Sequence, residues 1–153
     1  MAINPTREQI EAVAAIAGTG SGGPLVMLNL NRYRERAAYA SAPPGGVATD
    51  VTGREAYERY AATALRVLAR VGGEVVWQAH STHTVIGEAS ERWDEVIAVR
   101  YPSAQAFLDL ALDPELGVAL AHRDAGLERA AVIRCDEPVL PLEQDLHCPQ
   151  RIG

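Results

Sequence analysis

The sequence predicts an α+β domain in which a four-stranded antiparallel sheet carries two helices on one side. Four apolar, strand-like stretches recur along the chain, and patterns typical of amphipathic helices follow the first and the third of them. With 153 residues and 48% hydrophobic side chains, the chain is long and apolar enough to form one packed core. We therefore expect a single domain, with additions at both of its ends.

The chain divides into three predicted segments. Residues 1–23 contain a short helix over residues 5–17, which Thr6 and Gln9 cap, followed by a glycine-rich hinge. Residues 24–135 form the main domain. Residues 136–153 hold three prolines without any periodic pattern, so we expect a C-terminal tail.

The first half of the main domain begins with a strand over residues 24–33, which is apolar on both faces up to Asn29. The loop insertion over residues 34–52 contains a Pro-Pro-Gly-Gly run, and a loop of this length suggests a lid or a disordered excursion. An amphipathic helix is predicted over residues 53–71, and the glycine pair that follows it is typical of a helix end.

The second half is predicted as two strands, two helical segments and a last strand. The first of these strands covers residues 74–86 with a bend near Ser81, and the second covers residues 93–101 with Trp93, Glu95, Ile97, Val99 and Tyr101 on one face. A helix over residues 104–112 restarts at Asp113-Pro114 and runs to about residue 125, before a strand over residues 128–135.

The order β-α-β-β-α-β is that of the ferredoxin-like fold. In this plan one face of the sheet has no helix over it, although the first strand is apolar on both faces. Burying that open face against the same face of a second copy is the simplest symmetric solution. We therefore expect a homodimer.

Several segments together resemble one family, DUF1330, over residues 24–134. The segments that carry the resemblance are residues 26–30, 55–60, 72–77, 93–96, 100–103, 106–108 and 122–127. The resemblance implies the dimeric α/β-barrel superfamily, which includes cofactor-free monooxygenases, polyketide cyclases, muconolactone isomerases and some haem enzymes. It implies no particular activity, because proteins that share a fold can differ in function.

Composition and charge exclude several classes of function. The net charge is −6 and all 14 basic residues are arginines, so we expect no nucleic-acid partner. No apolar run has the length of a membrane span, and residues 1–9 lack the pattern of a signal peptide. Cys135 and Cys148 are expected to be free thiols, which fits a cytoplasmic protein.

The adjacent pair His122 and Arg123 is the first candidate for catalysis. Arg123 could bind a carboxylate or an enolate, a role that the family resemblance favours, and His122 could move a proton near neutral pH. Successive helical residues point about 100° apart, so we expect only one of the two to reach a pocket. The alternative is that both merely complement the negative end of the helix dipole.

Further candidates come from the strands and the first long helix. Asn29 interrupts an apolar strand, so its amide could bind a substrate carbonyl or could tie down a neighbouring loop. Tyr60 is either a hydrogen-bond donor or an aromatic packing residue. Asp94 and His80 could act as acid or base groups if buried, whereas an exposed Asp94 would be only a surface charge.

Two tryptophans could contact a planar ligand. Trp77 is expected in the core, with a stacking platform as the alternative, and Trp93 is equally consistent with the core or with a pocket wall. His80 and His83 point to opposite faces of a continuous strand, so we expect no metal site. The sequence contains no pattern for a haem or flavin site, so we expect no cofactor.

These residues favour a cofactor-independent enzyme that acts on a small, partly apolar metabolite with a carbonyl group. Its chemistry would be proton transfer leading to isomerisation, cyclisation or elimination. The alternatives are a non-catalytic small-ligand-binding protein and a cofactor-free monooxygenase, which would use the same kind of base.

Overall fold

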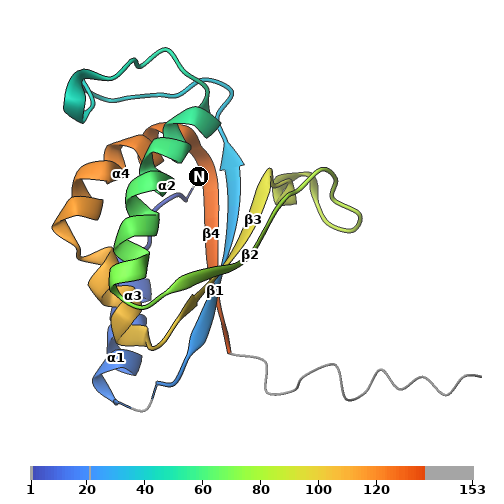
Figure 1. Cartoon of the computed structure of the whole chain (residues 1–153). Helices are drawn as coiled ribbons and strands as arrows, with labels where there is room; N and C mark the ends of the chain where they lie inside the picture. Colours follow the sequence, from blue (N-terminus) through green and yellow to red (C-terminus); the bar gives the residue numbers. More distant parts are fainter. Residues whose placement is uncertain (1, 21, 137–153) are drawn as a thin grey trace, which may run out of the picture.

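The structure is a computed structural model and describes residues 2–20 and 22–136, so the predicted tail, with His147 and Cys148, lies outside the described residues. It has the predicted α+β, ferredoxin-like fold. Four antiparallel strands form a sheet in the order β2-β3-β1-β4 (Figure 1). The strands are β1 (Leu25–Tyr33), β2 (Glu74–His80), β3 (Glu95–Tyr101) and β4 (Leu127–Asp136).

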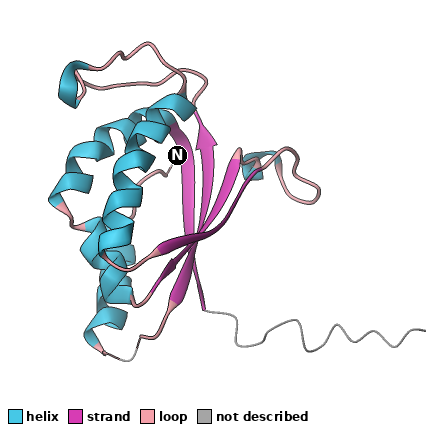
Figure 2. Cartoon of the chain, viewed as in Figure 1, coloured by secondary structure: helices cyan, strands magenta, loops and turns pink. Residues whose placement is uncertain are grey.

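The four α-helices of the described residues lie on one side of the sheet (Figure 2). They are α1 (Arg7–Gly18), α2 (Gly53–Arg70), α3 (Ala104–Ala111) and α4 (Pro114–Gly126), and two short 3-10 turns are η1 (Pro44–Gly46) and η2 (Ala89–Glu91). The predicted capping box of Thr6 and Gln9 is present at α1, and Asp113 caps α4. Thr52 and Glu55 form a second capping box at α2.

The register of the sheet separates its two faces. Leu25 and Met27 of β1 point toward the helices, as do Val99 and Tyr101 of β3, and all four are buried in the core. The predicted alternation along residues 95–101 is therefore confirmed. On the opposite face, which no described α-helix covers, side chains of all four strands form an apolar surface; its members are Val26, Leu28, Leu30, Trp77, Ala79, Val96, Ala98, Ala131 and Ile133.

Strand β2 differs from the prediction in two ways. A register shift between Val75 and Trp77 places Trp77 opposite Ala98, on the open face, where 54% of its surface is exposed. The prediction that Trp77 belongs to the core is therefore wrong, because a bulge interrupts the simple alternation of the strand. β2 also ends at His80 rather than at residue 86, next to the predicted bend.

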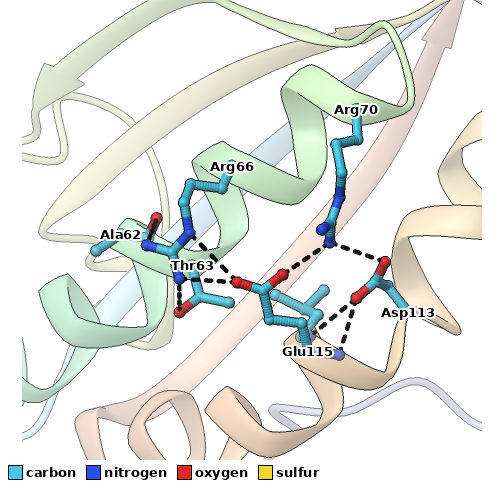
Figure 3. Close-up of polar contacts among 7 residues, drawn as sticks. Ala62, Thr63, Arg66, Arg70, Asp113 and Glu115 are labelled. Carbon is cyan, nitrogen blue, oxygen red and sulfur yellow. Dashed lines mark hydrogen bonds and ion pairs between the residues drawn. The ribbon is translucent and has the colours of Figure 1, made fainter.

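Helices α2 and α4 are joined at both of their ends. Where α2 begins and α4 ends, a Cβ atom on Gly53 would lie 2.6 Å from Gly126 O, so only glycine permits this approach. At the other end, Arg70 of α2 pairs with Asp113 at 3.1 Å and with Glu115 at 2.9 Å (Figure 3). The two helices are thus fixed relative to each other along their length.

The segment over residues 34–52 folds back over the ends of α2 and α4 instead of extending away (Figure 1). Its backbone bonds to α4 through Ala38 N and Ala125 O at 2.9 Å. Arg59 donates to Ala48 O at 2.7 Å and thereby ties the far part of the segment to α2. Within the described part of the chain, no helix is long and apolar enough to cross a membrane.

Candidate active site

A cavity of about 340 Å³ lies between α2 and the helix-facing side of the sheet. Its volume is within the range of small-molecule sites in proteins. One end is apolar and the other is polar. The apolar end is lined by Ala61, Ala64, Leu65, Leu68, Val75, Ile97, Val99 and Leu110, and the polar end by Tyr33, Arg54, Gln78, His80 and Glu95.

The carboxylate of Glu95 is the central group of the polar end. Glu95 is only 4% exposed, and its neighbours along β3 on the same face are apolar, so its charge is isolated on that face of the strand. The hydroxyl of Tyr33 donates to Glu95 Oε2, and Gln78 Nε2 donates to Oε1 at 2.8 Å. Burial, followed by the hydrogen bond to Glu95, raises the pKa of Tyr33, so this hydroxyl stays protonated as a donor.

Arg54 and His80 form the outer part of the polar end, where their side chains are 37% and 69% exposed. Arg54 Nη1 lies 3.7 Å from Glu95 Oε1 and 3.2 Å from His80 Nδ1. Since a guanidinium can only donate, His80 Nδ1 accepts and the ring proton is on Nε2. The guanidinium carbon also lies 4.7 Å from the centre of the Tyr33 ring, a cation–π contact.

Three tyrosines form a row along the cavity. The ring of Tyr57 lies 5.3 Å from that of Tyr33 and 5.4 Å from that of Tyr60. Burial is the main effect that raises the pKa of Tyr57 to about 12, and burial also raises the pKa of Tyr60. The Tyr57 hydroxyl interacts with the amide of Asn31, which lowers its pKa as a donor would, so its own proton remains available to a ligand, as does that of Tyr60.

Two asparagines of β1 lie close to these tyrosines. Asn29 lines the cavity, and its Nδ2 donates to Met27 O at 3.1 Å and to Ile97 O at 3.4 Å. Asn31 is 3% exposed, and its Nδ2 has no hydrogen-bond partner among the described residues. It lies near the hydroxyls of Tyr33 and Tyr57 and lowers the pKa of both phenols, against the larger increase from burial.

The structure does not bring the pair His122 and Arg123 into this cavity. Arg123 donates to Asn4 Oδ1 at 3.0 Å. His122 Nδ1 lies 2.8 Å from the hydroxyl of Tyr39, which in turn accepts from Arg59 at 3.1 Å. His122 therefore belongs to the contact between α4 and the folded-back segment over residues 34–52.

Three further predicted site residues are also not part of the cavity lining. Asp94 accepts from the backbone of Tyr33 at 2.8 Å and lines a more open hollow of about 600 Å³, which adjoins the cavity and shares Tyr33 and Arg54 with it. Trp93 precedes β3 and stacks on the guanidinium of Arg129 at 4.8 Å. Trp77 points to the open face because of the bulge in β2. Of the eight predicted site residues, Asn29, Tyr60 and His80 line the cavity.

Sequence reasoning did not single out Glu95, Tyr33, Gln78 or Arg54. For Glu95 a signal was present, because it is the one charged residue on an otherwise apolar face of a strand. For Tyr33, Gln78 and Arg54 no signal existed, because their approach to Glu95 depends on the strand register and on the start of α2.

No group of three or more metal-ligating side chains comes together in the part of the chain that the structure describes. Around Glu95 lie Tyr33, Gln78, Arg54 and His80, and of these four only the histidine is a common metal ligand. The arrangement instead provides one buried carboxylate and several neutral donors, which suits the transfer of a proton.

Fold and cavity together define a ferredoxin-like α+β protein with a ligand-sized site between its sheet and its helices. The family model described as "Domain of unknown function (DUF1330)" matches residues 47–134, more than half of the chain. The chain therefore belongs to the DUF1330 family, as its sequence predicted. No curated protein matches the sequence.

Two solved structures are similar over almost the whole chain. The methylated RPA0582 protein is 39% identical, with 92% of this chain and 96% of that chain covered and a TM-score of 0.77. A second structure of RPA0582, described as a protein of unknown function from Rhodopseudomonas palustris, is 38% identical over 91% and 98% of the two chains, with the same TM-score of 0.77.

A more distant similarity concerns the fold alone. Hydroxynitrile lyase from Passiflora edulis has a TM-score of 0.52 and 9% identity, with 78% of this chain and 97% of that chain covered.

Proposed function

We propose that the protein is a cofactor-independent enzyme that transfers a proton on a small, partly apolar carbonyl compound, with Glu95 as the acid/base group. The observation that carries the proposal is the buried carboxylate of Glu95 at the polar end of an otherwise largely apolar cavity. A carboxylate so placed is partly desolvated, and desolvated carboxylates act as bases in many active sites.

The chemistry follows from the positions of the groups. Glu95 takes a proton from the carbon next to the substrate carbonyl, and the electrons of the broken C–H bond move to the carbonyl oxygen. The hydroxyls of Tyr57 and Tyr60 stabilise the resulting enolate oxygen by donating hydrogen bonds. Return of the proton to another carbon completes an isomerisation, while attack of the enolate on a second carbonyl, or loss of a leaving group, gives cyclisation or elimination.

Hydrogen–deuterium exchange at an activated carbon tests this proposal without knowledge of the natural substrate. The probe is 2-acetylnaphthalene, whose methyl protons are acidic, followed by proton NMR in D₂O. We expect the wild-type protein to accelerate the exchange and Glu95→Gln to lose about 10²-fold or more of that acceleration. Glu74→Gln, an exposed carboxylate change on the same sheet, is the matched control and should leave the exchange rate unchanged.

Exchange that is equally fast in Glu95→Gln would show that Glu95 is not the acid/base group.

The second candidate function is that of a non-catalytic binding protein. The pairing of Glu95 with Tyr33 and Gln78 favours it, since both oxygens of the carboxylate already have partners. In that case the probe binds but its protons exchange no faster than in buffer.

We also propose that the protein is a cytoplasmic homodimer in which two copies pair through the open, apolar faces of their sheets. Trp77 and Ile133 are each roughly half exposed at this side of the molecule, and contiguous apolar surface of this kind is typical of an interface. A second copy would cover it symmetrically.

A further inference from the structure

The charged groups that line the cavity are few and mostly satisfied. They are Arg54, Glu58, His80 and Glu95. Arg54 is the one permanent cation among them, and it already contacts Glu95, His80 and the ring of Tyr33. Against this one permanent cation stand two carboxylates, those of Glu58 and Glu95.

Two other arginines, Arg123 and Arg59, make their bonds outside the cavity, although the charge of Arg123 reaches Tyr57 and Tyr60. Arg123, which the sequence suggested as a carboxylate ligand, donates to Asn4 and also lies 3.9 Å from Asp124. Arg59 is bound to Tyr39 and to Ala48 O in the folded-back segment. Neither arginine lines the cavity, so a carboxylate ligand would find only Arg54 as a cation in the lining and would meet the charge of Glu95.

The groups that do remain available are neutral donors beside an apolar wall. Tyr57 and Tyr60 line the cavity together with the small side chains of Ala61 and Ala64, all four on α2. Because burial raises the pKa of both tyrosines, these hydroxyls keep their protons throughout the physiological pH range. Neutral donors at an apolar wall fit a carbonyl oxygen attached to an apolar body.

We propose that the site is selective for uncharged carbonyl compounds, such as ketones and esters without a carboxylate, whose carbonyl oxygen accepts from Tyr57 and Tyr60. This inference rests on the proposed function and narrows its substrate class. The negative lining excludes carboxylates of the same shape, and the apolar end accommodates the rest of the molecule.

A pair of probes with the same shape tests the selectivity. 2-Naphthoate has a charged oxygen where 2-acetylnaphthalene has a methyl group. The dissociation constants of both can be measured by NMR titration near pH 7.5. We expect the ketone to bind at least about tenfold more tightly to the wild-type protein, because one like charge lies close to the carboxylate. In Glu95→Gln, naphthoate binding should improve about tenfold while ketone binding stays within about twofold.

A second variant pair examines the donors. Tyr57→Phe should weaken ketone binding about fivefold, as expected for one lost hydrogen bond. The control Tyr39→Phe, which removes a hydroxyl outside the cavity, should leave ketone binding unchanged.

The outcomes separate this inference from the proposed function. Naphthoate that binds the wild-type protein as tightly as the ketone overturns the selectivity, even if Glu95-dependent exchange is observed. Preferred binding of the ketone without any exchange supports the selectivity and overturns the acid/base function. Binding of neither probe overturns both.

Discussion

The hydrogen bond from Tyr33 to Glu95 joins two buried side chains of adjacent strands. Tyr33→Phe would leave one oxygen of a buried carboxylate without its partner, so we expect the free energy of unfolding to fall by about 1–3 kcal/mol. Urea denaturation followed by circular dichroism measures the change. Tyr60→Phe is the control, because that hydroxyl has no well-formed bond to a described residue, and equal losses in the two variants would contradict the assignment.

His122 makes the contact between α4 and the folded-back segment sensitive to pH. Burial and then the nearby Arg59 lower the pKa of His122 from its usual value of 6.5. The pKa of this histidine is therefore lower in the folded protein than in the unfolded protein. Its contribution to stability is complete above the pKa of the unfolded protein and is lost as the pH falls through the window below 6.5. Protonation would also remove the acceptor that Tyr39 uses.

We therefore expect the wild-type protein to lose more stability between pH 7.5 and pH 5 than His122→Gln, which cannot be protonated there. Urea denaturation at both pH values measures the difference. The same pH dependence in both proteins would show that His122 does not titrate in this way.

The sequence alone predicted part of the lining of the candidate site. Asn29, Tyr60 and His80 line the cavity because strand and helix periodicity assign them to inward faces. His122 and Arg123 are not at the cavity, because periodicity gives the direction of a side chain but not which neighbour it meets. Glu95 could have been found as a charge on an apolar strand face, whereas Arg54 and Gln78 could not.

At the scale of elements, the crossing of α2 and α4 depends on two glycines. A Cβ atom on Gly126 would lie 2.4 Å from Gly53 O and 2.9 Å from Tyr57 N. Gly126→Ala should therefore lower the free energy of unfolding by about 1–3 kcal/mol, since the backbone must move. Thermal or urea denaturation measures this loss.

Gly117→Ala is the matched control in the same helix. A Cβ atom there meets nothing within 4 Å, and Gly117 is exposed within α4. This variant should gain about 0.5–1 kcal/mol, because alanine favours a helix. If both variants lost a similar amount of unfolding free energy, the cause would be the change within helix α4 and not the close approach of α2 and α4.

Most elements could be predicted because local signals determine them. Helix α1 begins at its capping box, and the Asp-Pro pair starts α4. The bulge in β2 and the placement of Trp77 could not be predicted, because they depend on pairing with β3 rather than on β2 itself. The packing of residues 34–52 onto α4 is a tertiary effect of the same kind.

At the scale of the whole molecule, the proposed dimer depends on the open face of the sheet. Trp77→Glu introduces a charge into the apolar surface on the edge strand β2, so we expect the mass measured by light scattering after size exclusion to fall from two chains to one. Val118→Glu is the control, because Val118 is 60% exposed on α4, on the other side of the sheet. A wild-type protein that is already a single chain would contradict the dimer.

The close approach of Gly53 and Gly126 also bears on how fast ligands exchange. It holds the start of α2 against α4, so we expect α2 not to move outward at this end of the cavity. The groups that a ligand would have to displace are then the partly exposed side chains of Arg54 and His80. Side-chain rotation takes picoseconds to nanoseconds, whereas loop and domain opening takes microseconds to milliseconds. Association should then proceed in a single kinetic phase whose rate rises linearly with ligand concentration.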